Sequence, residues 1–133
     1  MKPDQFLKTV YLGDRYCTKL VLDGCNHCVE IHVNQISRIR DKTGVWNYYI
    51  DEDIENWAIV ITGVKAVYLD DSGFMPNDEI DIYASESSDG YFEFVIDSCH
   101  VDDEAETHNL VIKVVGKGVH LIDPARPNQL IID

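Results

Sequence analysis

Short segments of alternating apolar and polar residues, separated by turn-forming residues, run through most of the chain. The clearest pairs of such segments span residues 20–33, 80–97 and 110–121. Alternation with a period of two places one face of an extended strand in a core and the other in solvent. Asp23-Gly24 and Asp89-Gly90 lie inside the first two pairs, and such turns favour hairpins. The pattern predicts an all-β, mainly antiparallel fold built from three hairpins.

The densest apolar segment, Trp57–Leu69, predicts two strands in the interior of the fold, joined by a tight bend at Gly63. Its β-branched residues favour strands over a buried helix. Roughly nine strands at spacings of about 8 to 12 residues are typical of a β-sandwich, with a partly open β-barrel as the alternative. We predict that the inner faces of the sandwich contain Leu20, Leu22, Ile31, Val33, Ile59, Ile61, Val67, Leu69, Ile80, Ile82, Phe92, Phe94, Ile112 and Leu121.

The alternation of apolar and polar residues shifts by one position once inside a predicted strand. Val33 and the alternate residues before it share one parity, whereas Ile36 has the other. Because one extra residue in a strand flips the side-chain face, we expect a β-bulge near Asn34 and Gln35. Residues 41–50 are then predicted to form a hairpin loop followed by another strand.

Length and composition indicate an ordinary globular chain, which we predict to be one β-sandwich domain over residues 1–133. Hydrophobic residues make up 45% and charged residues 26%, which excludes the disordered class. The N-terminal segment has no apolar signal region, and no later apolar run is long enough to cross a membrane. We therefore expect a cytoplasmic protein whose four cysteines are reduced thiols.

The charge balance is strongly acidic. Eleven Lys and Arg residues against 24 Asp and Glu give a net charge of −13, which would repel a nucleic-acid backbone. Such a surface favours fast association with a basic protein partner. We predict a non-enzymatic, acidic protein-interaction module, and an immunity or antitoxin-like inhibitor of a basic protein is one concrete form. The competing interpretation is that the acidity serves only solubility.

Cys25 and Cys28 form the sharpest candidate site, because two thiolates three positions apart in a tight turn can share one tetrahedral Zn²⁺. Cys17 and His27 lie nearby in the sequence. A redox pair and two plain reduced thiols in an exposed turn are the other interpretations. A small zinc-binding domain is accordingly an alternative function.

Acidic loops give a second metal hypothesis. Carboxylates cluster at residues 51–53, 70–71 and 102–104, all of which fall in predicted loops. Acidic loops at one end of a sandwich can bind Ca²⁺ through oxygen ligands, although the EF-hand spacing is absent from the sequence. The competing interpretation is that these loops are solvated and bind no ion.

The sequence contains no known catalytic motif, and we assign no catalytic or cofactor-binding residue from it. The remaining enzyme hypothesis is a site in a cleft at the sandwich edge. That hypothesis requires a concave pocket in which carboxylates lie beside at least two of His32, His100, His108 and His120.

Six short pieces of the sequence, taken in order, resemble a family of small bacterial all-β proteins of unknown function. The pieces are Tyr11-Leu12-Gly13-Asp14-Arg15, Ile39-Arg40-Asp41, Trp46-Asn47-Tyr48, Asp51-Glu52-Asp53-Ile54, Thr62-Gly63-Val64 and Pro76-Asn77-Asp78. The resemblance spans most of the chain. It implies a bacterial, cytoplasmic, stand-alone domain, and it assigns no activity and no functional residue.

Overall fold

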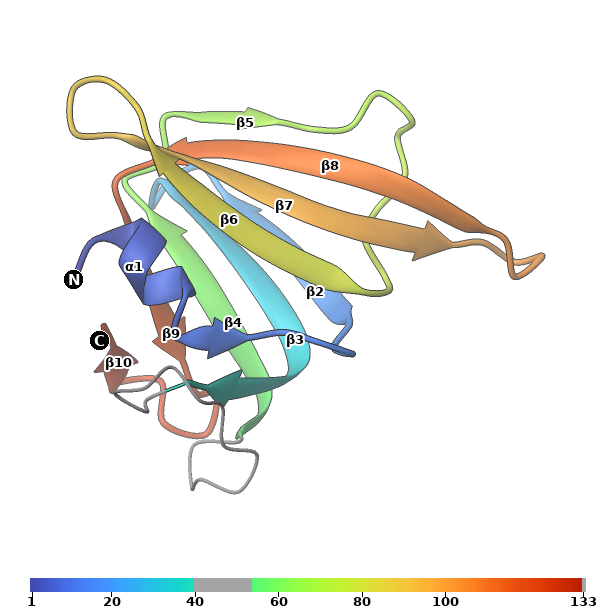
Figure 1. Cartoon of the computed structure of the whole chain (residues 1–133), viewed down its shortest axis with the longest axis horizontal. Helices are drawn as coiled ribbons and strands as arrows, with labels where there is room; N and C mark the ends of the chain where they lie inside the picture. The colour runs from blue at the N-terminus through green and yellow to red at the C-terminus, as the bar shows by residue number, and fades with distance from the viewer. Residues whose placement is uncertain (40–53, 133) are drawn as a thin grey trace.

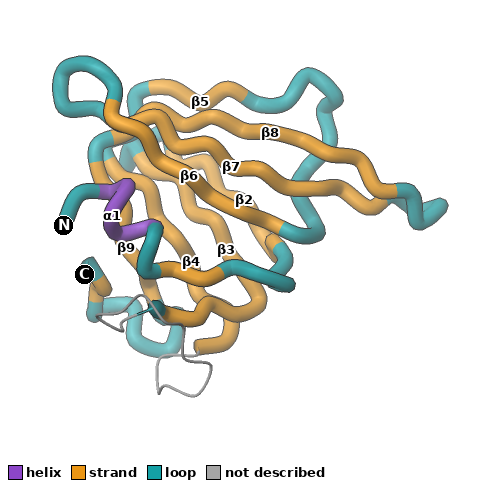
Figure 2. Tube along the Cα trace, viewed as in Figure 1, coloured by secondary structure: helices purple, strands orange, loops and turns teal. Residues whose placement is uncertain are grey.

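The computed structural model describes residues 1–39 and 54–132. In this part of the chain, two antiparallel sheets pack face to face, with one short helix at an end (Figure 1, Figure 2). The predicted all-β sandwich is confirmed, because the two sheets are separate rather than joined into a partly open barrel. The hairpin predicted within residues 41–50 and the acidic cluster at 51–53 lie outside the described residues.

The larger sheet has the strand order β1-β3-β4-β9-β10, and β2 pairs with β3 on the same edge as β1. Its strands are β1 (Val10–Tyr11), β2 (Cys17–Asp23), β3 (Cys28–Arg38), β4 (Ile54–Thr62), β9 (Gly118–Ile122) and β10 (Leu130–Ile131). In the β2–β3 hairpin, Leu20 pairs with Ile31 and Asp23 with Cys28. This confirms the hairpin that alternation predicts over residues 20–33.

The smaller sheet has the strand order β5-β8-β7-β6. Its strands are β5 (Ala66–Tyr68), β6 (Ile80–Glu86), β7 (Phe92–Val101) and β8 (Thr107–Gly116). The predicted hairpin over residues 80–97 is confirmed as β6–β7, in which Ile82 pairs with Ile96. Strands β7 and β8 form a longer hairpin, which projects past the end of the larger sheet (Figure 1).

Two glycine turns carry the chain from one sheet to the other at the same end of the sandwich. Gly63, with φ of +60°, follows β4, and residues 116–118 connect β8 to β9. The N–H of Lys117 donates to the carbonyl of Thr62 at 2.8 Å, so the two turns lie against each other. The hairpin predicted over residues 110–121 is therefore wrong, because a sharp turn between extended segments also suits a crossover between sheets.

The core lies between the two sheets. Most of the predicted inner-face residues are buried there: Ile31, Val33, Ile59, Ile61, Ile80, Ile82, Phe92, Phe94, Ile112 and Leu121. Leu20 and Val67 are only partly buried against this core. The predictions for Leu22 and Leu69 are wrong, since their side chains are 49% and 58% exposed. Leu22 lies near the tip of an edge hairpin, and Leu69 lies just beyond β5, which is itself an edge strand rather than an interior one.

The helix α1 (Pro3–Leu7) closes one end of the core with the buried side chains of Phe6 and Leu7. Proline suits the first helical position because its missing N–H would have no partner there. The buried guanidinium of Arg38 lies over the Phe6 ring at 5.1 Å, and its Nη2 donates to Thr9 Oγ1 at 2.9 Å. These contacts hold the N-terminal segment against the sandwich, beside β6.

Candidate functional site

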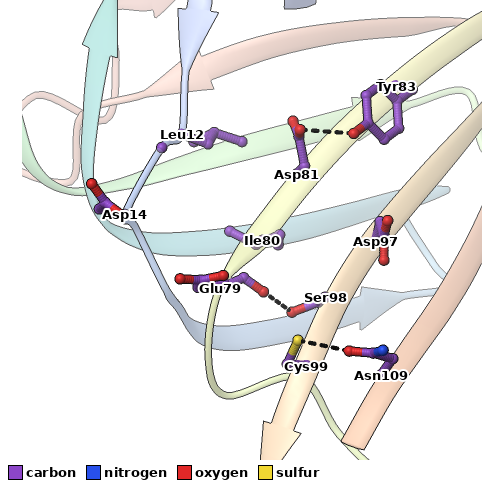
Figure 3. A pocket seen from close by; sticks show the side chains of 11 residues that line it. Leu12, Asp14, Glu79, Ile80, Asp81, Tyr83, Asp97, Ser98, Cys99 and Asn109 are labelled. Atoms are coloured by element: carbon purple, nitrogen blue, oxygen red, sulfur yellow. Dashed lines mark hydrogen bonds between the residues drawn. The ribbon is translucent and has the colours of Figure 1, made fainter. Parts of the chain in front are cut away.

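An open cleft of about 480 Å³ lies at the β6 edge of the smaller sheet and extends over its outer face (Figure 3). Strands β6, β7 and β8 form its floor, and the segment after β1 forms one wall. That wall is held in place because Tyr16 pairs with Glu79 and the N–H of Cys17 donates to the carbonyl of Asp78 at 3.0 Å. The cleft is lined by Leu12, Gly13, Asp14, Glu79, Ile80, Asp81, Tyr83, Asp97, Ser98, Cys99 and Asn109.

The polar residues that alternate with core residues along the β6–β7 hairpin place carboxylates on the floor of this cleft. Asp81 alternates with the buried Ile80 and Ile82, so its side chain faces outward, and the hairpin register sets Asp97 directly opposite it. Glu79 and Asp14 add two more exposed carboxylates at the rim. Among the described residues that line the cleft there is no Lys, Arg or His. The cleft therefore presents a concentrated negative charge to solvent.

Hydrogen bonds fix the orientation of the polar groups on the floor. The Tyr83 hydroxyl donates to Asp81 Oδ2 at 2.8 Å, and the N–H of Ile82 donates to Asp81 Oδ1 at 2.9 Å. The bond to Asp81, together with the carboxylate's charge, raises the pKa of Tyr83. The phenol thus stays protonated and holds the Asp81 carboxylate in one position.

Cys99 is the one thiol among the described residues that line the cleft, and its surroundings favour the protonated form. Its Sγ lies 3.3 Å from Asn109 Oδ1. Partial burial is the main cause that raises the pKa of this thiol, and the carboxylates of Asp78, Glu79 and Asp97 raise it further. Reactive cysteines need the opposite surroundings, which stabilise the thiolate. The surroundings of Cys99 therefore do not favour a nucleophilic thiolate.

Replacing Asp97 with asparagine is expected to stabilise the free protein. Like charges directly opposite each other on neighbouring strands are unfavourable, and removing one should raise the free energy of unfolding by about 0.2–1 kcal/mol. Urea denaturation at low ionic strength measures this gain, which should shrink as added salt screens the pair. Asp71→Asn is the matched control, because Asp71 is exposed in the loop after β5 and does not have a left-handed backbone. A loss of stability in Asp97→Asn, or an equal gain in the control, would contradict the assignment of repulsion to this pair.

Cys25 and Cys28 lie in the β2–β3 hairpin, where Cys25 is exposed and Cys28 is partly buried at the start of β3. Among residues 1–39 and 54–132, no third His, Cys, Asp or Glu joins these thiols in a cluster of converging donor atoms. Desolvation, with the charges of Asp23 and Glu30, raises the pKa of Cys28 and so disfavours a free thiolate. Zinc binding by Cys25 and Cys28 stays a prediction.

The acidic loops proposed for Ca²⁺ do not form one donor cluster within the described part of the chain. Asp70 instead organises its own loop, since its carboxylate accepts the N–H groups of Ser72 at 3.0 Å and Val111 at 3.0 Å. These bonds, with that of the Ser72 side chain first, lower the pKa of Asp70. Asp102 acts in the same way at the β7–β8 loop, and calcium binding at either loop stays a prediction.

The four histidines of the enzyme hypothesis separate into two groups, and neither group lines the acidic cleft. His32 and His120 lie on the outer face of the larger sheet, where His32 Nε2 is 3.3 Å from Glu30 Oε1 and burial lowers the pKa of His120. His100 and His108 pair across β7 and β8. Of these two, His108 lies beside a carboxylate, because its Nε2 is 2.8 Å from Asp102 Oδ2 at the far end of the hairpin.

The four carboxylates of the cleft are absent from the sites that the sequence predicts. A signal for two of them exists: the apolar residues of both strands share the core face only if the loop at Asp89-Gly90 has an odd number of residues, and a three-residue loop at 88–90 places Asp81 opposite Asp97. Both residues fall at polar positions of the alternation, so their shared outer face is also predictable. Asp14 and Glu79 could not be found in this way, because a contact between distant segments brings them to the cleft.

Comparison with protein families matches residues 1–133 to the model described as Family of unknown function (DUF6258). Comparisons with curated proteins and with solved structures find no match. No helix in residues 1–39 and 54–132 is long and apolar enough to span a membrane.

Proposed function

The chain belongs to DUF6258, and because this membership assigns no activity, we propose from the geometry that the protein is a non-enzymatic module that binds a basic protein partner through the acidic cleft. The observation that carries the proposal is the concentration of four carboxylates in one cleft whose lining, in the described part of the chain, has no basic side chain. The opposed pair Asp81 and Asp97 is unfavourable in the free protein and becomes favourable once a cation lies between them.

The occupant that the cleft suits best is an arginine side chain presented by the partner. A planar guanidinium can donate to two carboxylates at once, and it stacks well on an aromatic ring. Asp81 and Asp97 supply the carboxylates, and Tyr83, 53% exposed beside them, supplies the ring. Arginine and aromatic contacts of this kind dominate the energy of many protein interfaces.

An inhibitor of a basic protein, similar in role to an immunity protein or antitoxin, is the concrete form of the proposal. The overall charge of −13 would speed association with a cationic target, and the cleft would fix the register of the complex. A bacterial cytoplasm is the proposed location. The four free cysteines suit a reducing compartment, and the resemblance noted above implies a bacterial source.

Affinity capture with matched variants tests the proposal. The wild-type protein should retain a basic protein from a bacterial lysate at about 0.05 M salt and release it at about 0.5 M, where screening acts over a few ångströms. The variant Asp81→Asn/Asp97→Asn should retain far less of the same protein. The control Asp89→Asn/Asp103→Asn changes the charge equally at exposed loop positions and should behave like the wild type. Equal capture by both double variants would contradict a role for the cleft.

A further inference from the structure

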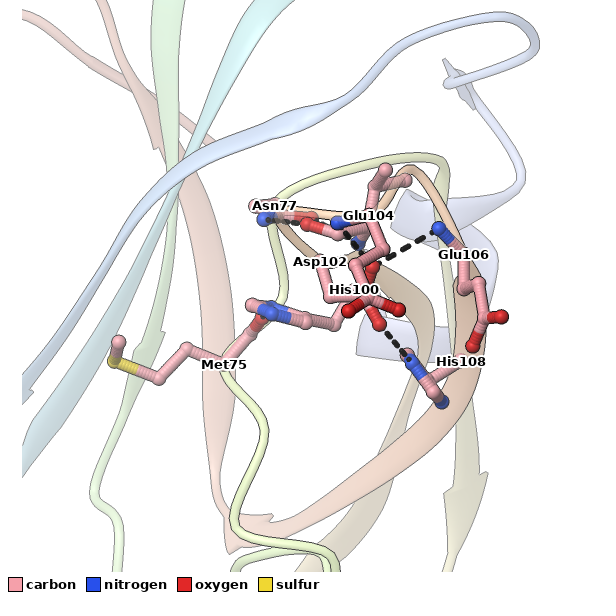
Figure 4. A network of polar contacts seen from close by, with 8 residues as sticks. Met75, Asn77, His100, Asp102, Glu104, Glu106 and His108 are labelled. Atoms are coloured by element: carbon pink, nitrogen blue, oxygen red, sulfur yellow. Dashed lines mark hydrogen bonds and ion pairs between the residues drawn. The ribbon is translucent and has the colours of Figure 1, made fainter.

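A second cluster of polar side chains lies where the β7–β8 hairpin ends, away from the acidic cleft (Figure 4). Asp102 follows β7 and organises the loop: its Oδ1 accepts the N–H groups of Glu104 at 2.9 Å and Glu106 at 3.0 Å. The N–H of Asp102 also donates to the carbonyl of Glu106 at 3.0 Å. The loop thereby fixes the Asp102 carboxylate and brings Glu106 back beside it.

Three donor atoms converge in this loop. Asp102 Oδ2 lies 2.8 Å from His108 Nε2, and a carboxylate oxygen of Glu106 completes a group whose donor atoms all lie within 4.8 Å of one another. Among residues 1–39 and 54–132, this is the one group of at least three His, Cys, Asp or Glu side chains with such spacing. The side chains of His108 and Asp102 are only 32% and 26% exposed, so the pair is partly shielded from water.

Aromatic contacts hold the imidazole in position. The ring of Phe74 stacks on His108 with centroids 4.5 Å apart and on His100 with centroids 4.7 Å apart. His100 is itself anchored, because its Nδ1 lies 2.7 Å from the carbonyl of Met75. Both histidines have the parity of the core residues on β7 and β8, but the hairpin has passed the end of the larger sheet there (Figure 1). Phe74 therefore packs against the two histidines in place of core residues, and this packing limits rotation of the His108 ring.

We propose that Asp102, Glu106 and His108 bind a divalent transition-metal ion of the Zn²⁺ class. Two carboxylates and one imidazole are ligands that Zn²⁺ accepts, and three protein ligands leave one position of a tetrahedral site open to water. Tetrahedral bonds of about 2.0–2.1 Å place ligand atoms about 3.3 Å apart. The Asp102–His108 contact therefore needs to open by only about half an ångström, with the ion replacing the imidazole proton, which moves to Nδ1 or to solvent.

The ligand set separates this site from a calcium site. Ca²⁺ takes six to eight oxygen ligands, whereas this group offers an imidazole nitrogen and two carboxylates. A bound ion would join the loop to β8 through Glu106 and His108. It would thereby clamp the tip of the projecting hairpin.

Isothermal titration calorimetry with zinc chloride tests the site, using untagged protein freed of metal with a chelator. We expect about one equivalent of Zn²⁺ to bind the wild type, and prior addition of CaCl₂ at the same concentration to leave this Zn²⁺ binding unchanged. Glu106→Gln and His108→Ala should each weaken Zn²⁺ binding at least about tenfold, since loss of even the groups that support metal ligands costs 10- to 100-fold. Glu104→Gln, an exposed carboxylate in the same loop, should leave the affinity unchanged.

The variant Cys25→Ser/Cys28→Ser distinguishes this site from the two thiols. It should bind Zn²⁺ like the wild type, and far-ultraviolet circular dichroism should show that every variant is folded. Zinc binding that survives Glu106→Gln and His108→Ala but is lost in the cysteine variant would assign the metal to the β2–β3 turn and overturn the proposal. Absence of binding to the folded wild type at about 1 mM Zn²⁺ would overturn it as well.

Discussion

Replacing Phe94 with aspartate is expected to prevent the protein from folding. Phe94 is fully buried on β7, an interior strand of the smaller sheet, between Ala84 and Val114 on the neighbouring strands. An unpaired buried carboxylate costs several kcal/mol, against a total stability of about 5–15 kcal/mol for a domain of this size. Circular dichroism and a thermal melt of the purified variant should show no cooperative transition.

Lys113→Asp is the matched control for this substitution. It places the same side chain on β8, one strand away, at an exposed position on the outer face. It should therefore remain folded, with a change in the free energy of unfolding of about 0.5 kcal/mol or less. A cooperatively melting Phe94→Asp protein would show that the inner face of β7 is assigned incorrectly.

Trp57→Ala is expected to lower the free energy of unfolding by about 3–5 kcal/mol, the range measured for large aromatic residues in cores. The Trp57 side chain is 1% exposed and lies on β4, opposite the buried Val33 of β3. Removing it leaves a cavity between the sheets that the β3–β4 ladder is too rigid to fill. Urea denaturation of the variant and the wild type gives the difference directly.

Trp57→Phe separates the effect of volume from that of the indole nitrogen. Among the described residues, Trp57 Nε1 is buried and has no hydrogen-bond partner. Phenylalanine fills much of the same space and removes this unsatisfied donor, so its cost should be clearly smaller than that of alanine. An equal loss in both variants would indicate that the nitrogen makes a bond essential for folding.

The alternation of apolar residues and the turn residues were sufficient to predict the hairpins β2–β3 and β6–β7. Two strands that follow each other in the sequence and are joined by an Asp-Gly turn can pair without any contact to a distant segment. These local features were insufficient at Gly63 and at residues 116–118, where a glycine turn between two extended segments marks a crossover between the sheets and not a hairpin. What decides the outcome there is the pairing of β9 with β4, between segments far apart in the sequence. Nothing in the turn residues themselves encodes that partner.

The phase change in β3 shows how a correct signal can have a different physical cause. The β3–β4 register keeps the same offset from Val29 to Ile36, although Asn34 has no partner in it. The ladder therefore holds no inserted residue there, and the bulge predicted near Asn34 and Gln35 is wrong. The irregularities lie on the partner strands instead. Asn56 of β4 has φ of +59°, and the register of β2 shifts between Cys17 and Lys19. Alternation in one strand reveals that a ladder is disturbed but not which strand carries the distortion.

The candidate sites were only partly predictable, for a related reason. The acidity and the hypothesis of a basic partner follow from composition. The place where the charge concentrates depends instead on register and on the contact between residues 16 and 79. The proposed metal site was predictable in part, since Asp102 belongs to an acidic loop that the sequence singles out. Its other members, Glu106 and His108, join it through the conformation of the loop.

The cleft and the metal group share the β7–β8 hairpin but lie on opposite faces and at different distances along it. Asp97, Cys99 and Asn109 face the cleft, whereas His108 has core parity beyond the end of the core. Asp102 lies in the loop between the strands. A partner that extended from the cleft toward the tip of the β7–β8 hairpin would therefore also contact the end of this hairpin. The rigidity of that end depends on the loop that contains Asp102.

A nuclear magnetic resonance titration of the ¹⁵N-labelled protein with an arginine-rich peptide tests the role of the cleft most directly. At about 0.05 M salt, the largest amide shift changes should fall at Asp81, Tyr83, Asp97 and Cys99, and about 0.5 M salt should reverse them. In Asp81→Asn/Asp97→Asn these changes should disappear, while Asp89→Asn/Asp103→Asn should keep them. Shift changes spread evenly over the acidic loops, or unaffected by the cleft substitutions, would show that the peptide responds to overall charge and that the cleft is not the binding site.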